Sequence, residues 1–220
     1  MPTSVNYFYK SRWWMKLFSP HLIWRIATRE KEVFLTFDDG PSDPITTKVL
    51  SLLKEFDAKA TFFCIGKNVG YNPALFSAIV NEGHLIGNHT FHHINGWKCS
   101  GERYVASINR CETIFGSSFF RPPFGKITWK QIRHIKHRFK IVMWTILSGD
   151  FDKSLNTADI LADLKLNVKK GDIIVFHDNA KTADRLLEIL PQFLAFLKQE
   201  GYKCSVIREP KKWYHFNSKP

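Results

Sequence analysis

The 220-residue sequence predicts one α/β domain built on a parallel sheet. Three observations lead to this fold class. Short apolar runs alternate with segments of helical periodicity, the alternation continues from residue 32 to residue 207, and no low-complexity tract or repeat divides the chain. On this pattern alone a closed barrel and an open doubly wound sheet both remain possible. No G-x-G-x-x-G follows any apolar run, which is unfavourable for a dinucleotide-binding fold.

Seven apolar runs are expected to form the strands: 32–37, 60–65, 84–88, 118–121, 140–146, 172–176 and 202–207. Six helices are expected between these runs. Three should begin at Asp43-Pro44, Asn72-Pro73 and Asn156-Thr157, and three should span 101–115, 128–138 and 182–200. Asp and Asn are preferred N-caps, and Pro suits the first helical position because the N–H that it lacks has no partner there. Pro191 can kink the last helix.

The sequence has a net charge of +12, from 32 Lys and Arg against 20 Asp and Glu. This excess indicates either an ordinary basic surface or an anionic partner, such as phospholipid headgroups or an anionic cell-wall polymer. No nucleic-acid-binding motif accompanies the charge, so we expect no nucleic-acid partner. The four cysteines form no C-x-x-C pair, which predicts buried thiols in a reducing compartment rather than a cysteine-based zinc site.

Residues 7–26 are aromatic and basic, and charged residues interrupt every apolar run among them. The segment therefore lacks the ~18 apolar residues that a membrane span needs, and it has no signal-peptide pattern. It could pack over one end of the domain, or it could lie at a membrane interface, where Trp and Tyr beside Lys and Arg are favourable. We expect a protein of the cytoplasm or of the inner membrane face, with peripheral membrane contact in the second case.

Acids, bases and candidate ligands end or follow five of the predicted strands. They are Asp38 and Asp39, His89 and His93, Arg121, Asp150, and His177 with Asp178. Because the carboxyl ends of parallel strands meet at one edge of the sheet, these side chains are expected to share one site. Asp178 has a second interpretation, as a cap of the helix that follows.

His89 and His93 are four residues apart, which on a helix or tight helical turn places both imidazoles on one side. His92 offers an alternative pairing three residues apart. Adding one carboxylate from the first strand gives two His and one Asp, a set that suits Zn²⁺ or another divalent first-row metal. Gly40-Pro41 ends that strand, so both Asp38 and Asp39 could turn toward the rim; otherwise Asp-Asp-Gly-Pro is an ordinary turn.

The motifs TFDDGP (36–41), HTFHH (89–93), RPPFG (121–125), W-x5-D-F (144–151) and VFH (175–177) occur in this order. They resemble the five motifs of the polysaccharide deacetylases, the NodB-like carbohydrate esterases of family 4, over residues 33 to about 207. The resemblance implies a distorted (β/α)7 or (β/α)8 barrel. It also implies an enzyme that uses one divalent metal to remove acetyl from an N-acetylated sugar.

By this resemblance Asp39, His89 and His93 would hold the metal, with Zn²⁺ the first expectation and Co²⁺, Ni²⁺ or Fe²⁺ the alternatives. Asp38 would be the general base and His177 the general acid. The remaining roles are as follows: Arg121 orients Asp38, Asp150 tunes the acid or the arginine, the Phe124 N–H faces the oxyanion, Phe151 forms an aromatic wall, and Val175 lines the acetyl pocket.

Four positions depart from the usual family pattern. Phe124 stands where Tyr is common, Phe151 where Trp is common, and Val175 where Leu is common. Leu147 stands where many members have a further Asp, so Asp150 would have to act alone.

The resemblance divides the chain into an N-terminal extension (1–30), a polysaccharide deacetylase domain (31–210) and a basic tail (211–220). Peptidoglycan, chitin oligomers and lipid-linked glycans all carry acetylated amino sugars, and the positive charge favours an anionic or membrane-linked one. Two other functions remain open: hydrolysis of a non-carbohydrate linear amide on the same fold, and a binding module without catalysis. The sequence leaves the oligomeric state undetermined.

Overall fold

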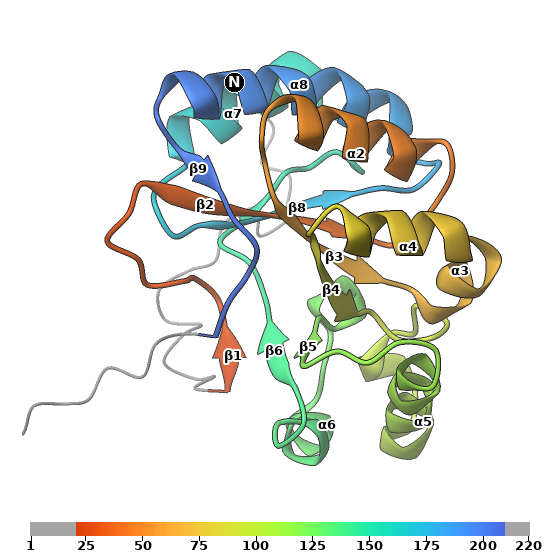
Figure 1. Ribbon diagram of the computed structural model, residues 1–220. Coiled ribbons are helices and arrows are strands. Elements are labelled where there is room, and N and C mark those ends of the chain that lie inside the picture. Colours follow the sequence, from red (N-terminus) through yellow and green to blue (C-terminus); the bar gives the residue numbers. More distant parts are fainter. Residues whose placement is uncertain (1–20, 210–220) are drawn as a thin grey trace, which may run out of the picture.

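The computed structural model describes residues 21–209, in which parallel strands curl into a distorted barrel surrounded by helices (Figure 1). The strands are β1 (Leu22–Ile23), β2 (Glu32–Asp38), β3 (Ala60–Cys64), β4 (Leu85–Asn88), β5 (Phe119–Phe120), β6 (Lys140–Val142), β7 (Ile146–Leu147), β8 (Ile173–His177) and β9 (Lys203–Cys204). The α-helices are α2 (Ile45–Glu55), α3 (Gly66–Tyr71), α4 (Pro73–Asn81), α5 (Gly101–Glu112), α6 (Trp129–Ile135), α7 (Thr157–Asn167) and α8 (Ala183–Gln199). Single 3₁₀ turns span Gly96–Lys98 and Pro123–Gly125.

The strand order is β1-β6-β5-β4-β3-β2-β8-β7, with β9 paired to the start of β2, and every pair of strands is parallel. The predicted barrel-like fold is therefore confirmed. Helices α2 and α8 lie side by side over β2 and β8, and α7 packs against α8 (Figure 1). The largest apolar cluster fills the space between these helices and the sheet, and a second lies inside the barrel around Phe34, Phe63 and Ile173.

The alternation of side chains along β2 and β8 directs the polar residues into the barrel. Thr36 and Asp38 follow Phe34 at intervals of two, so they share its inward face. The register pairs Asp38 with His177 at the carboxyl ends of the two neighbouring strands. An acid and a base thus meet at one end of the barrel, as the sequence predicts.

The run predicted as one strand over 140–146 is split into two, which corrects that prediction. Lys140–Val142 pairs with β5 and β1, whereas Ile146–Leu147 pairs with β8 at the other end of the strand order. Between them the Met143 N–H donates to the Ile23 carbonyl and the Thr145 N–H to the Ile173 carbonyl. One segment therefore crosses between the two ends of the sheet and brings them together.

Residues of the predicted N-terminal extension take part in the barrel. Leu22–Ile23 adds a strand beside β6, Trp24 and Ile26 are buried, and an Arg25 Nη2 lies 3.1 Å from an Asp172 carboxylate oxygen. Residues 22–26, the end of the segment 7–26, thus pack on the domain. Residues 7–20 and the tail 211–220 lie outside the described residues, so membrane contact and the two domain boundaries stay predictions.

Other differences from the predicted elements are local. Helix α3 was not among the predicted elements, and its glycines at positions 66 and 70 lower helix propensity. Helix α8 continues through Pro191, and α2 begins only after Pro44. The cysteines of the described part are free thiols. In that same part of the chain we find no helix with the length and hydropathy needed to cross a membrane.

Candidate active site

Three candidate metal ligands converge at the carboxyl end of the barrel. Asp39 follows β2, and His89 and His93 lie on the loop after β4. Asp39 Oδ1 is 3.1 Å from His93 Nε2 and 3.6 Å from His89 Nε2, and one ligand atom from each residue lies within 4.8 Å of the others. Asp39 Oδ1 is buried without a hydrogen-bond partner. An orphaned oxygen facing two imidazole nitrogens fits a bound cation, so this group can hold one metal ion.

The two histidines reach the same point from a loop, not from a helical turn as their spacing suggested. The backbone of His93 is left-handed, with φ of 53°, as is that of Thr90, with φ of 62°. The His89 Nδ1–H donates to the Arg121 carbonyl over 2.8 Å, which leaves Nε2 free for the metal group. His92 is exposed and lines a different cavity, so the alternative pairing through His92 is wrong.

Two asparagines that sequence analysis missed hold Asp39 in place. The Asn179 side chain donates to Asp39 Oδ2 over 2.8 Å, and the Asn68 side chain donates to the Asp39 carbonyl over 2.7 Å. The backbone of Asp39 has φ of 81°, a conformation that needs such support. Asn179 follows directly after His177-Asp178 at a strand end, which was a usable signal; Asn68 lies on the unexpected helix α3 and gave none.

Burial keeps the two histidine ligands in the neutral form that binds metals. Burial and the charge of His93 lower the pKa of His89 to about 3, against the opposing charge of Asp39. Burial also lowers the pKa of His93, again against Asp39. Neither ring therefore has to lose a proton before it can act as a ligand at neutral pH.

Asp38 is fixed by a fully buried arginine. Arg121 Nη1 donates to Asp38 Oδ1 over 2.7 Å and also to the Thr36 hydroxyl. The remaining guanidinium nitrogens donate to the carbonyls of Val142 and Met143. Asp38 Oδ2 lies 4.0 Å from His89 Nε2, so this oxygen faces the metal group while the other is held.

Asp150 contacts His177 rather than Arg121. Its Oδ1 lies 2.9 Å from His177 Nδ1, and its Oδ2 accepts the His177 backbone N–H over 2.7 Å. Burial lowers the pKa of His177, but the charge and hydrogen bond of Asp150, with Asp39 and Asp38, outweigh it and raise the pKa to about 9. His177 is thus protonated at neutral pH, with Nδ1–H on Asp150 and Nε2–H available.

Asp178 does not cap the following helix, which corrects that interpretation. Helix α8 has Thr182 at its N-cap, without a capping bond from a side chain. The buried Asp178 carboxylate instead accepts the Gly40 N–H and the Thr46 hydroxyl, and so ties β8 to the loop that carries Asp39. Burial, with the charge of Asp39, raises the pKa of Asp178 to about 8.

The three residues predicted to contact substrate lie around this group. The Phe124 ring is 59% exposed and its centroid is 4.5 Å from that of His93. The Phe151 ring meets His177 edge-on at 5.4 Å, and Val175 lies two residues before His177 on β8, opposite Leu147. Their proposed roles at the oxyanion and the acetyl group stay predictions.

Comparison with known proteins agrees with the resemblance seen in the motifs. The family model described as Polysaccharide deacetylase matches residues 25–142. A peptidoglycan-N-acetylglucosamine deacetylase from Bacillus cereus is 32% identical, over 89% of this chain and 95% of that protein. A chitooligosaccharide deacetylase from Azorhizobium caulinodans is 33% identical, over 70% of this chain and 77% of that protein.

A solved structure has the same architecture. It is the crystal structure of the Bc1960 peptidoglycan N-acetylglucosamine deacetylase in complex with 4-naphthalen-1-yl-N-oxidanyl-benzamide. It is 31% identical, covers 85% of this chain and 91% of that chain, and has a TM-score of 0.80. With more than half of the chain matched by the family model, and with relatives above 30% identity along most of its length, the chain belongs to the polysaccharide deacetylase family.

Proposed function

We propose that this deacetylase uses Zn²⁺ to remove the N-acetyl group from a glucosamine unit of peptidoglycan. The observation that carries the proposal is the placement of a held carboxylate, Asp38, and a protonated imidazole, His177, in register at the mouth of the barrel beside Asp39, His89 and His93. Hydrolysis of an amide needs both a base for the attacking water and an acid for the leaving nitrogen. The relatives named above are a peptidoglycan-N-acetylglucosamine deacetylase and a chitooligosaccharide deacetylase.

Asp39, His89 and His93 would hold the ion, and a set of two imidazoles with one carboxylate suits Zn²⁺, with Co²⁺, Ni²⁺ or Fe²⁺ as alternatives. A metal in such a site would polarise the acetyl carbonyl of the substrate and lower the pKa of a water molecule bound there. Asn179 and the Arg121 carbonyl fix the Asp39 and His89 side chains, so the ligand set is ordered by the protein itself.

Asp38 would remove the proton from the attacking water. Because Arg121 occupies Oδ1, the proton is received at Oδ2, the oxygen that faces the metal group. The water oxygen forms a bond to the acetyl carbon as its O–H bond breaks. The buried guanidinium keeps the carboxylate in one orientation, which removes the need to order it at each turnover.

His177 would then protonate the leaving nitrogen from Nε2. Its Nδ1–H is held by Asp150, so the proton that can be donated is on the nitrogen away from Asp150. As the C–N bond breaks, the nitrogen leaves as a free amine and the acetyl group as acetate. We propose that the Phe124 N–H stabilises the oxyanion, a contribution commonly of about 3 kcal/mol per donor, and that Phe151 and Val175 enclose the acetyl methyl.

The test combines metal analysis with acetate release. Purified protein reconstituted with Zn²⁺ should contain one ion and release acetate from N-acetylglucosamine oligomers and from peptidoglycan fragments. His89→Ala should lose the ion, whereas His137→Ala, at an exposed position in the turn after α6, should keep it. Full metal content in His89→Ala would contradict the ligand assignment. Acetate release from an acetylated peptide but from no glycan would establish the linear-amide alternative instead.

The place where the protein acts follows from its substrate. Mature peptidoglycan lies outside the cytoplasm, so this proposal favours the outer side of the membrane over the cytoplasmic location that the sequence suggested. The contact of residues 7–20 with a membrane stays a prediction, which sedimentation with vesicles, with and without these residues, would decide.

A further inference from the structure

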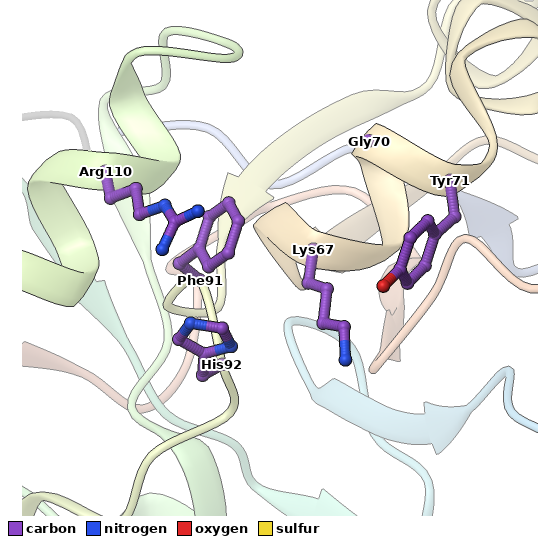
Figure 2. A pocket seen from close by; sticks show the side chains of 6 residues that line it. All are labelled: Lys67, Gly70, Tyr71, Phe91, His92 and Arg110. Atoms are coloured by element: carbon purple, nitrogen blue, oxygen red, sulfur yellow. The ribbon is translucent and has the colours of Figure 1, made fainter.

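A cavity lies against the loop that carries the histidine ligands, with Phe91 and His92 of that loop in its lining (Figure 2). Its volume is about 400 Å³, and it is lined by Lys67, Gly70, Tyr71, Phe91, His92 and Arg110. Figure 2 shows Lys67 and Tyr71 projecting from α3 on one side and Arg110 from α5 on the other, with His92 between them. Phe91 and His92 belong to the HTFHH motif, but the proposed chemistry uses none of these six side chains.

The charged groups around this cavity are all positive. Lys67 and Arg110 line it, and Arg103 lies seven residues before Arg110 on α5, on the same side of the helix. Among residues 21–209 these three cations form no ion pair.

The cations rest on aromatic rings instead of on counter-ions. The Arg110 guanidinium carbon lies 3.8 Å from the centroid of Phe91, and Lys67 Nζ lies 5.5 Å from that of Tyr71. Glu112, two residues after Arg110, uses its carboxylate to accept a hydrogen bond from the side chain of Asn88. The donors of the guanidinium and the ammonium are thus free to meet an external anion.

The cavity is tied directly to the metal group. The Lys67 N–H donates to the Phe91 carbonyl over 3.1 Å, and the Gly66 N–H donates to the Thr90 carbonyl over 3.1 Å. These bonds hold α3 against the loop on which His93 follows His92. The cavity is therefore built against the same loop that carries His89 and His93.

We propose that this cavity binds a carboxylate carried by the sugar unit adjacent to the one that is deacetylated, so that the enzyme prefers an acidic glycan to a neutral one. The inference rests on the proposed function and specifies its substrate class. A muramic acid unit of peptidoglycan that has lost its stem peptide carries a free lactyl carboxylate, whereas a chitin oligomer carries none. The cations Lys67 and Arg110, held on the rings of Tyr71 and Phe91, can bind the lactyl carboxylate. They have no anionic partner in a chitin oligomer.

Three glycans of equal length test the preference with the zinc-loaded full chain. They are an alternating N-acetylglucosamine and N-acetylmuramic acid tetramer with free carboxylates, the same tetramer with carboxamides, and the N-acetylglucosamine tetramer. We expect kcat/KM to be about 3- to 10-fold higher for the carboxylate than for the carboxamide. The preference should be smaller at 500 mM salt than at 50 mM salt. Over this range the Debye length falls below ~10 Å, so the attraction between the cations and the carboxylate is screened.

Charge removal in the cavity should reduce the carboxylate-to-carboxamide ratio. Lys67→Gln, Arg110→Gln and Arg103→Gln are each expected to lower it, while Arg110→Lys keeps the charge and should retain most of it. The matched control is Lys54→Gln, because Lys54 is exposed at the last turn of α2, at the opposite end of the barrel. This variant removes the same charge and should leave the ratio unchanged.

The failures of the two proposals can be told apart. Equal kcat/KM for carboxylate and carboxamide, with acetate still released from both, would refute the cavity assignment and leave the deacetylase intact. Absence of acetate from all three glycans would refute the proposed function. In that case calorimetry of the two muramic acid tetramers on the wild-type protein still decides the cavity: equal affinity for the two would refute the assignment, and tighter binding of the carboxylate would support it.

Discussion

Replacement of Asp150 by Asn should shift the pH range in which the enzyme is active. Asp150 is the largest influence that raises the pKa of His177, against burial, from 6.5 to about 9. A rise of this size corresponds to about 3 kcal/mol in favour of the protonated imidazole, whose side chain is 18% exposed. Because the folded-state pKa lies above the unfolded one, this stabilisation is complete below pH 6.5 and is lost as the pH rises through about 9.

Asn keeps the shape of the side chain but removes the charge. Without the charge of Asp150, the lowering effect of burial on His177 is no longer outweighed, and the pKa of His177 should fall to 6.5 or below. At pH 7.5 the protonated fraction would drop from about 97% to about 10% or less, so kcat/KM should fall at least about tenfold and recover in part toward pH 6. The alkaline limb of the pH profile should move down by about two units or more.

The assay is acetate release from an N-acetylglucosamine oligomer between pH 5 and pH 10. Asp57→Asn is the control, because Asp57 is exposed far from the site and its φ of 50° is one that Asn adopts readily. Thermal unfolding of both variants shows whether they remain folded. An alkaline limb that stays near pH 9 in Asp150→Asn would refute the assignment of His177 as the acid tuned by Asp150.

Two further substitutions address the groups that hold the site. Asn179→Ala removes the amide that donates to Asp39, and we expect the affinity for Zn²⁺ to fall about 10-fold or more, as measured by competition with a chromophoric chelator. Arg121→Met leaves the Asp38 carboxylate buried without its cation, and we expect the free energy of unfolding to fall by about 3–5 kcal/mol, as measured with urea.

Each of these variants has a control of the same residue type. Asn81→Ala, at the exposed end of α4, should keep full zinc affinity, and Arg133→Met, on the exposed side of α6, should keep the stability of the wild type. Unchanged zinc affinity in Asn179→Ala would show that its hydrogen bond does not position Asp39. Unchanged stability in Arg121→Met would mean that Asp38 is satisfied by other groups.

The sequence pattern was sufficient for the α/β class and for the meeting of the candidate residues, while the choice of a barrel came from the motif resemblance. Period-two alternation along β2 and a following Gly-Pro place Asp38 and Asp39 at a strand end, and parallel strands bring their ends to one edge. His89, His93 and His177 could be placed by the same rule. This rule needs only the knowledge of which strand a residue follows. An error of two residues in a predicted strand boundary therefore does not change its result.

Contacts between loops could not be predicted in this way. Asp178 resembles a helix cap, yet it bonds to Gly40 and Thr46, more than 130 positions away in the chain. The split of 140–147 has no local signal, since the apolar pattern is continuous and only the pairing partners change. These features are decided by which elements become neighbours, and periodicity along one segment contains no information on that.

The left-handed backbone at Asp39, Thr90, His93 and Phe124 has a consequence for anyone who would transplant the motif. Such conformations cost about 1–3 kcal/mol each outside glycine, and Thr90, branched at Cβ, is the least suited of the four. A free peptide with the letters HTFHH would relax to another shape. A designed copy of the site would need the ends of β2 and β4 together with Asn68, Asn179 and Arg121, because the contacts of these residues hold the loops in the conformation that brings the metal ligands together.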